Sequence, residues 1–338
     1  MANETNVLLL KEWLISTTPN GMLDLRLESD YSASHFPGST NIPFGKLDVR
    51  LFELPPKGYT LGVLYGTSSS NADGGDSEHI ENRIRSILEN YNIGFMLNEA
   101  QIPSDIKQQY MTESGSKSTL LWKPCTYLSD SIELIESHLK QDSRSGVGGN
   151  RDGDKFNAID IACGSGRDCL YLALRECWRV YGVDNDPILL NKMKEGADTY
   201  GCSQDIVDVV MDLETSTPPS ALEDSEIQHD QVIQYIEKIE KDLLEKQPQQ
   251  YDLVHVARYL YRPLFPALRN LVKPGGFILY HTFMVPSLGK PRRPRFLLKQ
   301  NELKDIFEKE FDVLNYQETH LEDGRPIQVI LCKKKIIK

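Results

Sequence analysis

The sequence lacks several features that would place the protein in a specialised class. Its six cysteines include no CxxC pair, so neither a paired zinc motif nor a thioredoxin-type redox motif is indicated. No apolar run approaches the ~20 residues that a membrane-spanning helix needs. The N-terminal sequence MANETNVLLLKEWL has no basic segment followed by a small-residue cleavage site. We therefore expect a cytoplasmic, intracellular protein with reduced cysteines and no membrane partner.

The composition is that of a folded chain with an acidic excess. The 338 residues include 49 Asp and Glu against 38 Lys and Arg, a formal charge of -11. At ~100–200 residues per domain, this length predicts two domains, or one large domain with insertions. The charge is uneven, because segment 213–248 carries nine acids and three bases while segment 288–299 carries five bases. The total charge argues against nucleic-acid binding by bulk attraction but does not exclude a local basic surface.

From residue 156 onward, strand-like apolar runs alternate with helical segments. Strands are expected at 156–162, 179–184, 206–212, 251–257 and 276–283, helices at 167–177, 187–201, 262–272 and 301–311, and a hairpin at 312–334. This alternation predicts a parallel, doubly wound α/β sheet with helices on both faces and one closing antiparallel strand. An acidic helical insertion at 213–248 separates the third strand from the fourth.

The strongest chemical signal is the run DIACGSG, which directly follows the first of these strands and precedes a helix. Its small residues let the backbone approach a ligand closely, and the next helix presents amide donors and a positive dipole end. Asp184 ends the second strand and is placed to accept hydrogen bonds from a ribose diol. A tight strand-to-helix turn is the alternative interpretation of the glycines by themselves.

Residues 156–335 resemble the class I S-adenosylmethionine-dependent methyltransferases. DIACGSG is similar to their glycine motif, VDNDP to their acidic ribose-binding loop, and LVKPGGFILYHTF to the turn into their fifth strand. The resemblance implies a Rossmann-like, seven-stranded domain with S-adenosylmethionine as cofactor. The residues it places around the cofactor are Asp160, Ala162, Cys163, Gly164, Gly166, Asp184, Asn185, Met211, Asp212 and His255. Ala162 stands where the family has its first glycine, which we expect to be tolerated if φ is negative there.

A narrower resemblance links the chain to the tellurite-resistance methyltransferases, a small-molecule-type group. The segments that carry it are CGSGRDCLYLA, ARYLYRPLFPALRNLVKPGGFILYHTF and GKPRRPRFLL. By this resemblance LWKP (121–124) and the following helix belong to the methyltransferase domain. We therefore place the linker at 112–118 and treat the glycine-rich stretch 143–154 as an internal loop.

Methyl transfer from a sulfonium mainly requires a positioned nucleophile, so substrate residues are sought at the carboxyl ends of the strands. The candidate catalytic residues are His255, Arg258 and His281, and the candidate substrate-binding residues are Tyr259, Arg262, Arg292 and Arg293. Each has a structural alternative: His255 as a core histidine, Arg262 as a support before a helix, and the basic segment as a solvated loop. Arg167 and Asp168 either cap the helix or reach the cofactor carboxylate.

A metal site is not expected from the clustered cysteines. Cys163, Cys169 and Cys177 are spaced by six and eight residues, which does not suit a compact site. Cys163 is interpreted instead as a small residue of the glycine loop.

The first block carries a different signature. The run LDLRLESDYSASHFPGSTNIPF (23–44) resembles the rhodanese family, with matching residues Asp24, Arg26, Tyr31, His35, Pro37, Gly38, Asn41 and Pro43. Active rhodaneses carry a cysteine after the next strand, but here that strand leads into YGTSSSN (65–71), and no cysteine precedes position 125. Because a serine hydroxyl cannot form a persulfide, we expect a small α/β recognition or scaffolding module without sulfurtransferase activity.

These observations predict three parts: a rhodanese-like domain at 1–111, a linker at 112–118 and a methyltransferase domain at 119–338. The leading function is methylation of a small molecule that uses S-adenosylmethionine. One alternative is RNA or protein methylation with the first domain as the recognition module. The other is a non-catalytic binding or scaffold protein that retains the cofactor fold.

Overall fold

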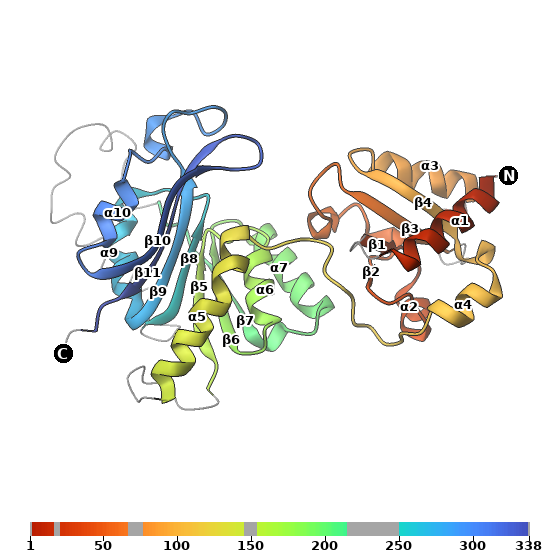
Figure 1. Ribbon diagram of the computed structural model, residues 1–338, viewed down its shortest axis with the longest axis horizontal. Helices are drawn as coiled ribbons and strands as arrows, with labels where there is room; N and C mark the ends of the chain where they lie inside the picture. Colours follow the sequence, from red (N-terminus) through yellow and green to blue (C-terminus); the bar gives the residue numbers. More distant parts are fainter. Residues whose placement is uncertain (1, 17–20, 67–76, 145–153, 215–249, 337–338) are drawn as a thin grey trace. The chain divides into compact units, whose positions relative to one another are not determined.

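The computed structural model describes residues 2–16, 21–66, 77–144, 154–214 and 250–336 (Figure 1). The chain divides into two compact units, Met1–Lys123 and Pro124–Lys338. Within the described ranges, no helix combines the length and the hydropathy that crossing a membrane requires.

The first unit is a small α/β structure around a four-stranded sheet. Its strands lie in the order β2-β1-β3-β4, and all of their pairings are parallel. The helices and strands are α1 (Ala2–Ile15), β1 (Gly21–Asp24), α2 (Glu28–Ala33), β2 (Ser39–Asn41), β3 (Thr60–Tyr65), α3 (Ser77–Ile87), β4 (Asn92–Asn98) and α4 (Ser104–Tyr110). Parallel strands need crossover connections, so this sheet requires the helices that separate its strands in sequence.

Apolar side chains of the first unit form two clusters. The apolar positions of α3 follow helical spacing, and Ile80, Ile84 and Leu88 are buried in one cluster with the residues of β1 and β3. Leu10 of α1 and Ile106 of α4 belong to the other cluster. Burial of each such side chain contributes about 1.5–3 kcal/mol. The two clusters therefore account for a core that this unit forms by itself.

The predicted linker at 112–118 is corrected by the structure, because this segment packs along the first unit. Glu113 pairs with His35 in an antiparallel bridge, and the amide of Thr119 donates to the carbonyl oxygen of Ser39 at 3.1 Å. Leu121, which we had placed in the second domain, is buried in the α3 cluster of the first unit. The boundary between the units therefore falls after Lys123, where this backbone pairing ends.

The second unit contains a seven-stranded sheet in the order β10-β11-β9-β8-β5-β6-β7. Its elements are α5 (Thr126–Arg144), β5 (Phe156–Ile161), α6 (Arg167–Ala173), β6 (Trp178–Asp184), α7 (Pro187–Thr199), β7 (Ile206–Val210), β8 (Tyr251–Ala257), α9 (Phe265–Leu271), β9 (Val272–Phe283), α10 (Glu302–Phe307), β10 (Phe311–His320) and β11 (Pro326–Lys334). Strand β11 runs antiparallel to both of its neighbours, while the five strands from β9 to β7 pair in parallel. The predicted α/β fold, with its closing antiparallel hairpin, is confirmed.

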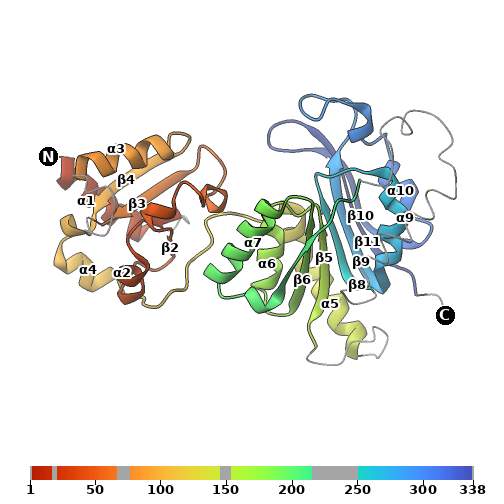
Figure 2. The same cartoon turned by 180° about the vertical axis from the view of Figure 1, so that it is seen from behind.

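The strand order reverses between β5 and β8. From β5 the chain moves outward to β6 and β7, whereas from β8 it moves in the opposite direction to β9. Because right-handed crossovers are nearly universal, these two directions place helices on opposite faces, with α6 and α7 on one and α9 on the other (Figures 1 and 2). In such sheets ligands bind at the carboxyl ends of the strands beside the reversal. The fold therefore predicts a ligand site at the loops after β5 and β8.

Candidate active site

The loop after β5 is shaped by two glycines with left-handed backbone. Gly164 has φ +58° and Gly166 has φ +71°. A Cβ on Gly166 would lie 2.2 Å from Met193 Cγ, so only glycine fits there, whereas a Cβ on Gly164 would meet no heavy atom within 4 Å. The amide of Cys163 donates to the Val183 carbonyl at 3.0 Å, which fixes the loop to β6. The loop therefore packs tightly against the protein at Gly166 and is open at Gly164.

Ala162 does not meet the condition under which we expected alanine to replace the first glycine. That condition was a negative φ, and the φ of Ala162 is +58°. The left-handed region costs a residue with a Cβ about 1–2 kcal/mol. Ala162 is thus a strained residue in the loop that the sequence had marked as the ligand site, which is where backbone strain concentrates in proteins.

Asp184 joins the glycine loop to the end of β6. Its Oδ2 accepts a hydrogen bond from the amide of Gly164 at 2.8 Å, and its Oδ1 accepts one from the amide of Asp186 at 3.0 Å. Asp186 in turn caps α7 by accepting from the amide of Ile188 at 2.8 Å. A carboxylate has about four lone-pair positions, and these backbone amides use two of them. Asp184 is therefore oriented by the backbone and retains acceptor capacity.

The remaining predicted cofactor residues lie at the ends of β6 and β7. Asn185 is exposed next to Asp184. Met211 is partly buried against the main core cluster, and its amide donates to the Asp184 carbonyl at 2.9 Å. Asp212 is exposed, and its Oδ1 accepts from the amide of Glu214 at 2.9 Å. The structure thus brings Asp184 and Met211 together at one edge of the sheet.

A polar cluster occupies the carboxyl edge at the strand-order reversal. His255, on β8, is fully buried, and its Nε2 lies 3.0 Å from Oδ2 of Asp168 in the first turn of α6. Oδ1 of Asp168 accepts a hydrogen bond from the amide of Cys125 at 2.7 Å. The Cys125 sulfur lies 3.6 Å from Nδ1 of His281, on β9. One cluster is therefore formed by residues of α6, β8 and β9 and by the residue before α5. The side chain of Asp168 does not cap α6 but takes part in this cluster.

Burial and neighbouring charge shift the protonation of this cluster. Burial raises the pKa of Asp160 to about 7. Burial by itself lowers the pKa of His255, but the carboxylates of Asp160 and Asp168 outweigh it, and the net shift is upward. Burial and the charge of His255 lower the pKa of His281 to about 3. Burial and Asp168 raise the pKa of the Cys125 thiol to about 12. The pKa values of the two histidines are therefore shifted in opposite directions.

Arg258 is a second strained residue beside this cluster. It has φ +58°, its side chain is exposed, and its amide donates to the His281 carbonyl at 2.8 Å. Tyr259 follows, and its hydroxyl lies 3.3 Å from Oε1 of Glu214. The predicted catalytic residues His255, Arg258 and His281 are thus close together, at the ends of two adjacent strands.

Arg262, for which the sequence left both a substrate role and a structural role open, makes structural contacts. Its guanidinium binds Glu302 through two nitrogens, at 2.6 and 2.9 Å. It also donates to the carbonyl oxygens of Arg295 and Leu297, at 3.0 and 2.8 Å. Arg262 therefore supports the basic segment rather than facing outward for a substrate.

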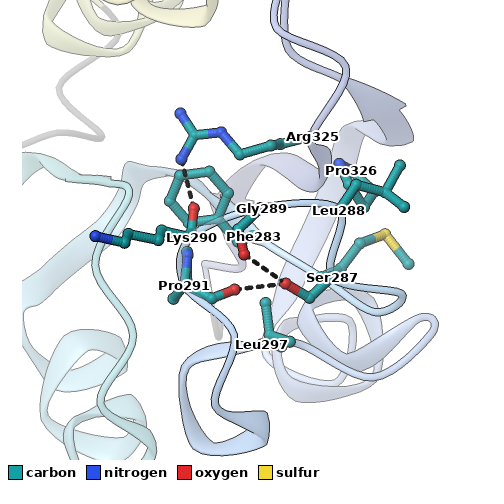
Figure 3. Close-up of a pocket in the computed structure, with 10 residues that line it drawn as sticks. Phe283, Ser287, Leu288, Gly289, Lys290, Pro291, Leu297, Arg325 and Pro326 are labelled. Carbon is teal, nitrogen blue, oxygen red and sulfur yellow. Dashed lines mark hydrogen bonds between the residues drawn. The ribbon is translucent and has the colours of Figure 1, made fainter.

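The basic segment after β9 is a loop stabilised by its own hydrogen bonds and by contacts from Arg325. Ser287 Oγ donates to the carbonyl oxygens of Gly289 and Pro291, and Arg325 donates to that of Lys290 at 2.6 Å around a small pocket (Figure 3). The guanidinium of Arg325 also lies over the ring of Phe283, 4.5 Å from its centroid. The predicted substrate residues in this loop, Arg292 and Arg293, are exposed, as is Arg295. The loop is thus an ordered basic surface.

The residues of the predicted rhodanese signature form a buried network in the first unit. Arg26 binds the Asp24 carboxylate through Nε and Nη2, at 3.0 and 2.7 Å. Asn41 donates to the carbonyl oxygens of both residues, and the rings of Tyr31 and His35 stack at 3.8 Å. These polar residues therefore stabilise the unit. The segment in which active rhodaneses carry their cysteine, residues 65–71 of this chain, falls largely outside the described residues.

Cys125 is the cluster member that sequence reasoning missed. It stands directly before α5 in the sequence KPCT, and no spacing rule connects it with a helix 43 residues later or with strands beyond. The only available signal was a cysteine just before a predicted helix. Its contacts depend on the packing of α5 against the sheet.

The second unit is thus an open, doubly wound α/β fold with a Rossmann-like glycine loop, a class of fold that binds nucleotide-type ligands at the strand-order reversal. No protein-family model matches the chain. A curated protein of Schizosaccharomyces pombe, the uncharacterized protein UNK4.09, is 25% identical over 335 residues, which cover 92% of this chain and 93% of that protein.

Three solved structures with similarity to the chain are methyltransferases or TehB. TehB from Haemophilus influenzae is 19% identical over 58% of this chain and 67% of its own, with a TM-score of 0.38. A SAM-dependent methyltransferase from Aquifex aeolicus is 17% identical (61% and 97%, TM-score 0.36). A putative rRNA-methylase from Clostridium thermocellum is 15% identical (63% and 98%, TM-score 0.39). These TM-scores are below 0.5, so the fold is assigned from the strand order and connections described above.

Proposed function

We propose that the protein is an S-adenosylmethionine-dependent methyltransferase that acts on a small molecule. The observation that carries the proposal is the connection of the glycine loop to Asp184 at the strand-order reversal. Asp184 fixes the loop through the amide of Gly164 and keeps acceptor positions for two ribose hydroxyls. The run DIACGSG and the loop VDNDP, which resemble the methyltransferase motifs, supply both partners of this connection.

The residues at this edge fit the methyl donor. The backbone at Gly164 is open, because a Cβ there would meet no heavy atom within 4 Å. Asp184 would hold the ribose, and Met211 with Asp212 would hold the adenine. The methionine end would lie over the loop at Cys163 and Gly164. This order of groups along the edge supports S-adenosylmethionine as the proposed donor.

S-adenosylmethionine, when bound, would supply a sulfonium-bound methyl group, which a nucleophile attacks in line while the sulfur leaves as a neutral thioether. The task of the chain is then to bind, to orient and to exclude water. Asp168 favours a cationic donor, because its hydrogen bond with His255 outweighs burial and lowers the pKa of Asp168. Ala162 and Arg258 both have left-handed backbone, in the loops after β5 and β8 at the reversal.

The surface around this edge favours an anionic acceptor. Arg258 is exposed at the end of β8, and Arg292, Arg293 and Arg295 are exposed on the loop after β9. Arg262 and Arg325 form ion pairs with Glu302 and Asp323, whereas none of those four has a carboxylate within 4 Å among the described residues. Guanidinium groups bind carboxylates and oxyanions well. A small anionic molecule is therefore the proposed acceptor.

RNA methylation is the second candidate, favoured by the same basic loop. Phosphate contacts from arginines would make RNA binding weaken steeply with salt. The first unit would then serve as a recognition module, which its lack of a cysteine before position 125 permits.

The test is methyl transfer from labelled S-adenosylmethionine to three separate fractions: small metabolites, RNA and protein. We expect label in the metabolite fraction, and no label there with the Asp184→Ala variant as the matched control. Label confined to RNA or protein would overturn the small-molecule assignment. Absence of label from all fractions, despite donor binding, would identify a non-catalytic binding protein.

A further inference from the structure

Three side chains that the sequence keeps far apart converge in the polar cluster of the second unit. One donor atom each from Cys125, Asp168 and His255 lies within 4.8 Å of the other two. They come from the residue before α5, the first turn of α6 and the end of β8. His281, on β9, lies beside this set, since its ring nitrogens lie 3.6 and 3.9 Å from the Cys125 sulfur.

The donor set and its spacing are those of a transition-metal site. Zinc takes thiolate, imidazole and carboxylate donors in tetrahedral sites, and bond lengths of about 2.0–2.3 Å place such donors roughly 3.3–3.8 Å apart. The donor atoms of Cys125, Asp168 and His255 lie within 4.8 Å of one another, and Asp168 and His255 are 3.0 Å apart, a hydrogen-bond distance that would lengthen slightly around an ion. We propose that Cys125, Asp168 and His255 bind one divalent transition-metal ion, with Zn²⁺ as the best match and His281 as an outer partner of the Cys125 sulfur.

Charge balance favours an ion of this class. A thiolate and a carboxylate would neutralise a dication, and the neutral imidazole of His255 would add no charge, so the set would carry none. Softer sulfur and nitrogen donors favour Zn²⁺ or Co²⁺ over Mg²⁺ and Ca²⁺, which take oxygen ligands.

The ligands are already oriented by the fold. The amide of Cys125 donates to Oδ1 of Asp168 at 2.7 Å, which leaves Oδ2 directed at His255. Such outer contacts hold metal-binding carboxylates in place. His281 contacts the Cys125 sulfur from β9 and is placed as such an outer partner.

The ion would fasten the start of α5 to the carboxyl edge of the sheet. Three protein ligands leave a fourth position for water or another small ligand. Metal binding and donor binding can be measured separately, because the ribose-binding Asp184 is not among the ligands.

The test measures metal binding by the full chain, after chelator treatment, with Co²⁺ as the spectroscopic probe and Zn²⁺ as the competitor. We expect one Co²⁺ per chain with a thiolate-to-metal absorption band, and displacement by Zn²⁺. Cys125→Ser should abolish the band and weaken Zn²⁺ binding at least about 100-fold, and His281→Gln should weaken it at least about 10-fold. Cys177→Ser, a cysteine outside the cluster, is the matched control and should bind as the unaltered chain does.

Absence of stoichiometric binding, or equal binding by Cys125→Ser and Cys177→Ser, would overturn the proposal. Circular dichroism of each variant shows whether it is folded, and the His281→Gln variant provides the answer if Cys125→Ser does not fold. S-adenosylmethionine affinity is measured separately on the same samples. Failure of the metal site and failure of the proposed methyltransferase function are therefore distinguishable.

Discussion

Replacement of Asp184 by alanine is expected to weaken S-adenosylmethionine binding by about 100-fold. A hydrogen bond to a charged group contributes about 1.5 kcal/mol or more, so the loss of two to the ribose is about 3 kcal/mol. Since about 1.4 kcal/mol corresponds to a factor of ten, this loss is a hundredfold change in Kd. The variant also releases the amide of Gly164, which Asp184 holds at 2.8 Å. Isothermal calorimetry on both chains measures the change.

The matched control for this prediction is Asp186→Ala, two residues away. Asp186 caps α7 but is not placed at the predicted ribose site, so its loss should cost about 1 kcal/mol of stability and leave donor affinity nearly unchanged. An unchanged affinity in Asp184→Ala would show that the ribose site lies elsewhere.

Replacement of Arg26 by alanine should destabilise the first unit by about 3–5 kcal/mol. Arg26 and Asp24 are almost fully buried, and removal of one partner leaves an uncompensated buried charge. The change also removes donors to Glu99 and to the Ser34 carbonyl, each at 2.9 Å. Denaturant unfolding followed by hydrogen exchange measures the effect, and peptides of the first unit should lose protection while those of the second unit keep theirs.

Lys46→Ala is the control for the buried pair, because it breaks an ion pair of similar length in solvent. Lys46 lies 2.9 Å from Glu28, and both side chains are more than half exposed. Its loss should cost no more than about 1 kcal/mol. A comparably small cost in Arg26→Ala would contradict a stabilising role for the buried signature residues.

Local patterns predicted most of the second unit. Strand and helix alternation follows from periodicity, and the parallel sheet follows from the alternation, so β5, β6, β8 and the closing hairpin lie where the sequence placed them. The positions of the glycine loop and Asp184 were also predictable. The loop directly follows β5, and Asp184 is the last residue of β6, so both lie at the carboxyl edge of the sheet.

Features that depend on long-range packing were not predictable. The segment 112–118 has the composition of a linker, but its Glu113 pairs with His35 and the adjacent Thr119 with Ser39, both more than 70 residues earlier. The Cys125 cluster joins residues up to 156 positions apart. Ala162 has a positive φ because of the turn geometry of the loop. The replacement of the motif's first glycine by alanine does not by itself reveal this backbone conformation.

The most direct test of the proposed function is calorimetric titration of the full chain with S-adenosylmethionine. The account predicts saturable binding of one donor molecule per chain, competed by the demethylated product of the donor and weakened by Asp184→Ala. Absence of binding by a chain that circular dichroism shows to be folded would contradict the account.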